Sequence, residues 1–144
     1  MTAPSTTSIL WPAFALAGWT LCMILLLAFR RVRAVQLRIA RLGQFALGEA
    51  GELPTHVALV NRNYMNLLEM PVLFYTVCVL SFAAGIVGVP LVGLAWAYVA
   101  LRMLHSLVHV TYNRILHRFA LFAASNVVLA LMWVLAGLGL AARG

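Results

Sequence analysis

Four long apolar stretches constrain this chain more than any other feature of its sequence. Residues 9–29, 70–89 and 119–142 carry no charge, and residues 91–112 contain one charged side chain, Arg102. A helix needs about 20 apolar residues to cross a hydrocarbon core of about 30 Å, so each stretch is long enough to cross a membrane. Because 65% of the 144 residues are hydrophobic, the composition excludes an ordinary water-soluble domain.

The sequence therefore predicts an all-α integral membrane protein, a four-helix bundle that forms a single domain over residues 1–144. With their polar flanks, the spans are expected at residues 9–29, 65–89, 91–112 and 118–142. The first stretch is not expected to be a cleaved signal peptide, because no positive charge precedes it and its apolar run is too long.

The charges predict how the spans are oriented. All ten cations are Arg and all three anions are Glu, which gives a net charge of +7. Arg gathers between the first and second spans and between the third and fourth, whereas the turn at residues 85–90 has none. Positive charge marks cytoplasmic loops, so we expect both termini on the non-cytoplasmic side. Nucleic acid is not an expected partner, because a basic binding face needs a soluble surface.

The segment after the first span alternates Arg with apolar residues and favours a helix that continues into the cytoplasm. Its Arg side chains suit contact with anionic lipid headgroups. The alternative is that Arg30 or Arg31 reaches a bound anion. The chain is expected to break at residues 48–54, after which Thr55 can cap the helix that enters the second span.

Polar residues within the spans form two stripes. A charged group at bilayer depth costs at least about 2.5 to 3.5 kcal/mol, so residues retained there are functional candidates. At about 100° per residue, each group shares one helix face. The stripes comprise Arg62, Asn66 and Glu69 on the second span, and Arg102, His105, His109 and Tyr112 on the third.

Both stripes fall toward the same side of the membrane, where Arg114 and Arg118 follow the third span. They predict one polar pocket open toward the cytoplasmic leaflet. Pro71 cannot donate a hydrogen bond to the carbonyl of Leu67, so we expect a kink beside the first stripe.

These residues admit more than one interpretation. Glu69 could neutralise Arg102 in an ion pair within the membrane, with His105 and His109 hydrogen-bonding between helices. The spacing of the two histidines also suits a metal or haem, and the same residues could carry protons or ions. Several Arg around one Glu favour an anionic ligand instead, and no metal is predicted, because the cations would oppose it.

The motifs resemble those of a known family. Residues 62–69 read R-x3-N-x2-E, and Arg102, His105 and His109 read R-x2-H-x3-H, with Arg114 and Arg118 following. Together with four spans in 144 residues, they resemble the MAPEG family, the membrane-associated proteins in eicosanoid and glutathione metabolism. The resemblance covers essentially the whole chain.

The resemblance implies a homotrimer that binds glutathione between neighbouring subunits and takes lipophilic substrates from the membrane lipid. Arg118 matches the Arg that stabilises the glutathione thiolate, and Arg114 is the alternative if the loop register differs. Arg30 or Arg31 matches a first-helix Arg that reaches the ligand from a neighbour. The implied catalytic residue is thus Arg118, and the implied glutathione-binding residues are Arg30, Arg31, Arg62, Asn66, Glu69, Arg102, His105, His109 and Arg114.

Three positions depart from family members. His109 stands where several members have Tyr, Phe119 where a prostaglandin synthase has Ser, and Phe122 where Tyr is frequent. These differences argue against prostaglandin E synthase activity.

The resemblance favours a glutathione-dependent transferase or peroxidase that acts on lipophilic electrophiles. A non-catalytic MAPEG-like protein that binds lipid is the first alternative. A His-ligated metal or haem membrane protein is the second.

Overall fold

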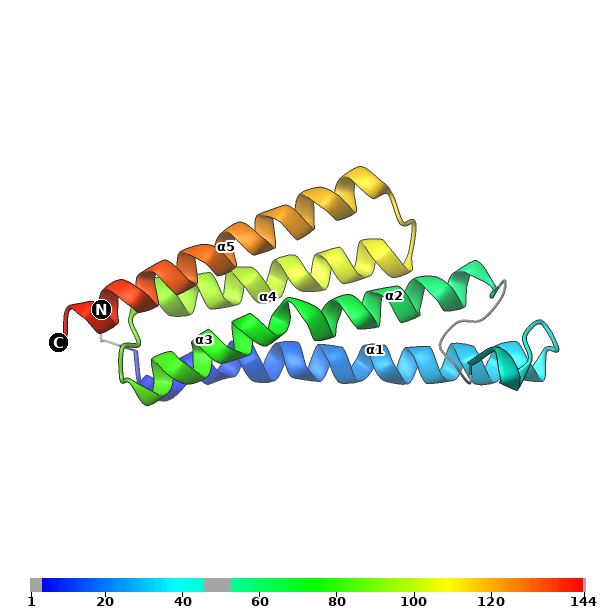
Figure 1. The fold of residues 1–144 in the computed structure, drawn as a ribbon, viewed down its shortest axis with the longest axis horizontal. Coiled ribbons are helices and arrows are strands. Elements are labelled where there is room, and N and C mark those ends of the chain that lie inside the picture. The colour runs from blue at the N-terminus through cyan, green and yellow to red at the C-terminus, as the bar shows by residue number, and fades with distance from the viewer. Residues whose placement is uncertain (1–3, 46–52, 144) are drawn as a thin grey trace.

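A computed structural model describes residues 4–45 and 53–143, and every element in these two ranges is helical (Figure 1). The elements are the short 3-10 helices η1 Thr6–Ile9 and η2 Leu42–Phe45, and the α-helices α1 Leu10–Gln36, α2 Thr55–Glu69, α3 Pro71–Ala83, α4 Val89–Val110 and α5 Ile115–Ala141.

Four helical segments in the described ranges are long and apolar enough to cross a membrane. They are Thr6–Gln36, Thr55–Ala83, Val89–Val110 and Ile115–Ala141. The predicted all-α fold with four membrane helices is confirmed, and the chain is an integral, multi-pass membrane protein.

The second membrane segment is interrupted where the sequence places a proline. α2 ends at Glu69 and α3 begins at Pro71, which lacks the N–H needed to continue the hydrogen-bond ladder. Met70 between them keeps helical angles (φ −62°, ψ −35°), so α3 continues onward from α2 (Figure 1). The hydrogen-bond ladder is therefore interrupted beside the polar stripe of α2, at the position where the sequence predicts a kink.

The ends of the first two helical segments differ in part from expectation. α1 continues to Gln36, well beyond the uncharged stretch, as predicted. The predicted break at residues 48–54 lies largely outside the described residues. Thr55 does not cap α2: Pro54 occupies the cap position, and its carbonyl accepts bonds from the backbone N–H of Val57 (2.8 Å) and Ala58 (3.2 Å).

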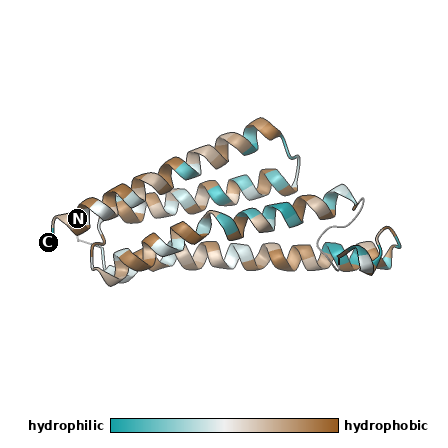
Figure 2. Cartoon of the chain, viewed as in Figure 1, coloured by the Kyte–Doolittle hydropathy of each residue, from teal (hydrophilic) through white to brown (hydrophobic). Residues whose placement is uncertain are grey.

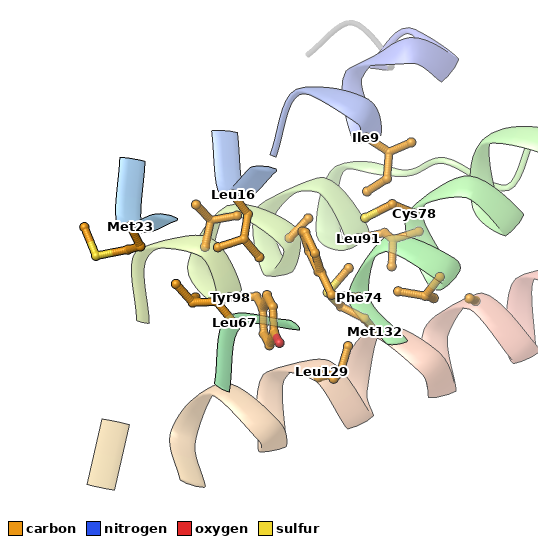
Figure 3. Close-up of a cluster of buried hydrophobic side chains, with 14 residues drawn as sticks. Ile9, Leu16, Met23, Leu67, Phe74, Cys78, Leu91, Tyr98, Leu129 and Met132 are labelled. Atoms are coloured by element: carbon orange, nitrogen blue, oxygen red, sulfur yellow. The ribbon is translucent and has the colours of Figure 1, made fainter. Parts of the chain in front are cut away.

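The core is apolar and draws on all four membrane segments (Figure 3). The rings of Phe74 and Tyr98 stack with their centroids 4.5 Å apart. Leu16 of α1 and Met132 of α5 are fully buried in the same cluster. Large apolar side chains also cover the outer surface, as expected for a surface in contact with lipid rather than water.

The polarity of the bundle differs between its two ends. Both described ends of the chain lie at the end that holds the α3–α4 turn, and the α4–α5 loop lies at the opposite end (Figure 1). Hydrophilic residues gather toward that opposite end, along α2 and the end of α1 (Figure 2). The fold therefore provides one polar half in an otherwise apolar bundle.

Candidate functional site

Three polar residues on one face of α2 form the first wall of the site. Arg62, Asn66 and Glu69 all line the same cavity, with Asn66 half-buried and the two charged residues exposed. One turn away on the buried side, the Asn63 amide donates to Ser106 Oγ of α4 at 2.6 Å. This buried bond joins α2 to α4 next to the cavity.

The second wall comes from α4, whose polar residues face inward. Arg102 is fully buried, and His105 and His109 are 2% and 3% exposed. The Arg102 Nη2 atom donates to the backbone carbonyl of Asn66, and its guanidinium lies 5.7 Å from the ring centre of Phe122. Its Nε and Nη1 atoms have no hydrogen-bond partner among the described residues, so Arg102 is not hydrogen-bonded to Glu69 there.

The third wall comes from the first turns of α5, where Arg118 is held from two sides. Its Nη1 atom donates to Asn113 Oδ1 at 2.9 Å and lies 3.3 Å from His109 Nε2. Asn113 adopts a left-handed backbone angle (φ 47°), and its N–H bonds to the carbonyl of Val108 at 2.8 Å. The turn after α4 therefore fixes the amide that holds Arg118.

These walls enclose a cavity of about 470 Å³. One side is polar and basic, and the apolar side is formed by Met65, Ile115, Phe119 and Phe122. The lining residues are Arg62, Met65, Asn66, Glu69, His105, His109, Ile115, Arg118, Phe119 and Phe122.

The structure thus gathers six of the predicted site residues around one cavity, and it places the others elsewhere. Arg102 lies next to the cavity, beneath Asn66 and Phe122. Arg114 is exposed and is not among the lining residues. Tyr112 lies beyond the end of α4 at Val110, is 60% exposed, and its hydroxyl bonds with His117 Nδ1 at 3.1 Å. The prediction that Tyr112 belongs to the polar stripe of α4 is wrong, because α4 ends at Val110.

Arg30 and Arg31 join α1 to α2 within the chain. Arg30 donates to the carbonyl of His56 at 2.6 Å, and Arg31 donates to Asn61 Oδ1 at 3.0 Å. The Arg31 guanidinium also lies 5.1 Å from the ring centre of Phe45. Neither Arg lines the cavity of its own chain.

Comparison with protein families identifies the chain. The model of the MAPEG family matches residues 9–138, nearly the whole length. The chain belongs to the MAPEG family. Comparison with curated proteins and with solved structures gave no match.

Membership assigns this MAPEG protein to a family of membrane proteins in glutathione and eicosanoid metabolism. The part of the chain that the structure describes holds no group of three or more His, Cys, Asp or Glu that could bind a metal ion.

The sequence of this MAPEG protein did not single out two polar residues near the cavity, Ser106 and Asn113. Ser106 follows Arg102 by four positions and so lies on the same helix face, which was an available signal. Asn113 follows the end of α4, where Asn is favoured because it tolerates left-handed angles. Neither signal reveals the partner, because Asn63 and Arg118 lie on other helices.

Proposed function

We propose that this MAPEG protein binds glutathione in the α2–α4–α5 cavity and activates its thiol for attack on lipophilic electrophiles. The observation that carries the proposal is the composition of the cavity, which places Arg62, Arg118, Glu69 and Asn66 around one space. Glutathione has two carboxylates, one ammonium group and one thiol. The cavity offers guanidinium groups for the carboxylates, a carboxylate for the ammonium, and an amide that can donate and accept.

Arg118 is the proposed catalytic residue, because a thiolate needs a nearby positive charge. A thiol with a pKa near 8.5 is only about 3% ionised at pH 7, and the thiolate is the nucleophile. Lowering this thiol pKa by about two units, equivalent to about 2.7 kcal/mol, raises the ionised fraction to about three quarters. One guanidinium next to the sulfur can supply that much where the bound ligand shields the pair from water, and buried Arg102 adds to the positive potential.

The chemistry is then that of a positioned sulfur nucleophile. In the transferase reaction, the thiolate sulfur forms a bond to an electrophilic carbon, and the leaving group departs with its electron pair. In the peroxidase reaction, the sulfur attacks a hydroperoxide oxygen and the O–O bond breaks to release an alcohol. A second glutathione thiol then reduces the sulfenic acid and yields the disulfide and water. Met65, Ile115, Phe119 and Phe122 give the apolar wall on which a lipophilic substrate would lie.

The same proposal includes the assembly and the orientation. The protein acts as a homotrimer, and Arg30 or Arg31 of a neighbouring subunit contributes to the glutathione site. The termini lie on the non-cytoplasmic side, and the cavity opens toward the cytoplasmic leaflet, as the distribution of Arg favours.

The test is conjugation of a chromogenic electrophile by purified protein in detergent. We expect Arg118→Ala to lower the rate at pH 7 by at least about tenfold, with much of the rate recovered at pH 9, where the free thiol ionises unaided. Arg41→Ala is the matched control, because it removes an exposed Arg that does not line the cavity. Equal rates for Arg118→Ala and wild type would refute the role of Arg118.

One observation favours a second candidate, a non-catalytic protein that binds glutathione or lipid. Phe119 and Phe122 both line the cavity, so these two positions offer no hydroxyl group to a substrate. Stabilisation by glutathione without turnover of any of several electrophiles would select this candidate. Failure of millimolar glutathione to stabilise the protein would contradict a glutathione site.

A further inference from the structure

The end of α1 carries a surface that the proposed glutathione site does not use. α1 has 27 residues, which gives a length of about 40 Å at about 1.5 Å per residue. A hydrocarbon core is only about 30 Å thick. Because the uncharged part of α1 ends at Phe29, we expect the following residues at the level of the lipid headgroups. This end of α1 extends beyond α4 and α5 (Figure 1).

A groove of about 500 Å³ runs along this end of the helix. It is lined by Phe29, Val32, Arg33, Gln36 and Leu37, which are spaced so that they share one face of α1. Phe29 and Val32 are 59% and 56% exposed, so their apolar surface is free within the single chain.

From Phe29 to Gln36, the order of side chains along the groove matches the order of groups in a phospholipid, and apolar Leu37 lies beyond them at the outer end. The apolar residues Phe29 and Val32 come first, on the side of the membrane core. Arg33 follows at the depth of the phosphate, and Gln36 lies one turn further out with a polar amide. An acyl chain, a phosphate and a polar headgroup would meet these residues in that sequence.

The charge of the surrounding segment determines the kind of lipid. Residues 30–45 contain five Arg and no acidic residue. Arg38 has a left-handed angle (φ 58°), and the N–H groups of Ile39 and Ala40 both bond to the carbonyl of Ala34, at 3.0 and 3.2 Å. This turn folds the chain back at the end of α1. Two copies of this face would repel each other if they paired directly, whereas an anionic lipid complements the positive charge.

We propose that this groove binds one anionic phospholipid, with its phosphate on Arg33 and an acyl chain along Phe29 and Val32. The site is separate from the glutathione cavity, which lies among α2, α4 and α5. Lipid binding can therefore be tested independently of the proposed enzymatic activity.

The first experiment compares lipids with matched acyl chains. Purified protein in a neutral detergent is heated with added phosphatidylglycerol or phosphatidylcholine, and the unfolding temperature is recorded. We expect phosphatidylglycerol to raise Tm by about 4 °C more than phosphatidylcholine. The difference should shrink at high salt, and glycerol 3-phosphate without acyl chains should give no rise. Equal shifts for both lipids, or a full shift with glycerol 3-phosphate, would overturn the proposal.

The second experiment separates a groove from diffuse attraction. Arg33→Gln removes one positive charge from the end of α1, and Arg41→Gln removes one from the segment that follows it, but only Arg33 lines the groove. We expect Arg33→Gln to abolish most of the preference for phosphatidylglycerol, Arg41→Gln to keep most of it, and Arg33→Lys to retain part. Equal losses in the two Gln variants would contradict a discrete site. If Arg33→Gln does not fold, Arg33→Lys and Arg41→Lys replace the two Gln variants: a larger loss of preference in Arg33→Lys supports the groove, and equal losses contradict it.

Discussion

At the scale of single residues, the site depends on how Arg118 is held. Its Nη1 atom contacts both Asn113 Oδ1 and His109 Nε2, so one end of the guanidinium is anchored by the turn and by α4. Asn113 can anchor Arg118 because its backbone tolerates the left-handed angle of the turn while its side-chain oxygen accepts the hydrogen bond from Arg118. A free Arg of this length would lose that orientation by rotation about its side-chain bonds.

The Asn113→Gly variant tests this anchoring. Gly accepts the left-handed angle without strain, so we expect Tm to change little while Arg118 loses its amide partner. If the bound thiol pKa then rises by about one unit, from about 6.5 to about 7.5, the thiolate fraction at pH 7 falls about threefold. The rate at pH 7 should drop by that factor and approach the wild-type rate at pH 9.

A double-mutant cycle supplies the control for Asn113. In the Arg118→Ala background, Asn113→Gly should have no further effect on the rate, because the group that it positions is gone. An unchanged pH profile in Asn113→Gly itself would show that Asn113 does not act through Arg118.

At the scale of elements, buried polar bonds fix how the helices meet at the site. The bond from Asn63 to Ser106 joins α2 to α4 within an apolar interior, and Arg102 joins the same helices through the carbonyl of Asn66. In an apolar surrounding such bonds set the register, because an unmade bond leaves a buried polar group without compensation.

Two serine variants test this register. Ser106→Ala leaves the Asn63 amide without its partner and should cost about 1 to 3 kcal/mol, or about 3 to 8 °C in Tm. Ser81 is the matched control: it is also fully buried, but its Oγ atom has no hydrogen-bond partner within the described residues. Ser81→Ala should therefore leave Tm nearly unchanged in detergent, and similar losses in both variants would refute the role of the Asn63–Ser106 bond.

At the scale of the whole molecule, the cavity is built from α2, α4 and α5, and α1 is absent from its lining. Within the chain, Arg30 and Arg31 bond to α2 instead. Under the proposed function, a first-helix Arg enters the site from a neighbouring subunit. Each active site would then need residues from two copies of the chain.

Mixed trimers test this requirement. Arg118→Ala and the double variant Arg30→Ala/Arg31→Ala should each be nearly inactive alone. When the two are assembled together at equal amounts, roughly a quarter of the sites would combine an intact Arg118 with an intact Arg30 and Arg31 from the neighbour. We expect the activity of the mixed trimers to recover toward that fraction of the wild-type activity. No recovery in verified mixed trimers would show that both contributions come from the same chain.

The sequence by itself determined the number of membrane helices, the interruption at Pro71 and the two polar stripes of α2 and α4. These features depend on local properties, namely apolar length, the missing N–H of proline and the period of the helix. Only the tertiary structure decided which residues meet: it brought Arg118 to Asn113 and His109, paired Asn63 with Ser106, and tied Arg30 and Arg31 to α2. It also ended α4 before Tyr112 and so removed that residue from the stripe. Contacts between helices depend on their packing and on where each one ends, and spacing along a single helix does not contain that information.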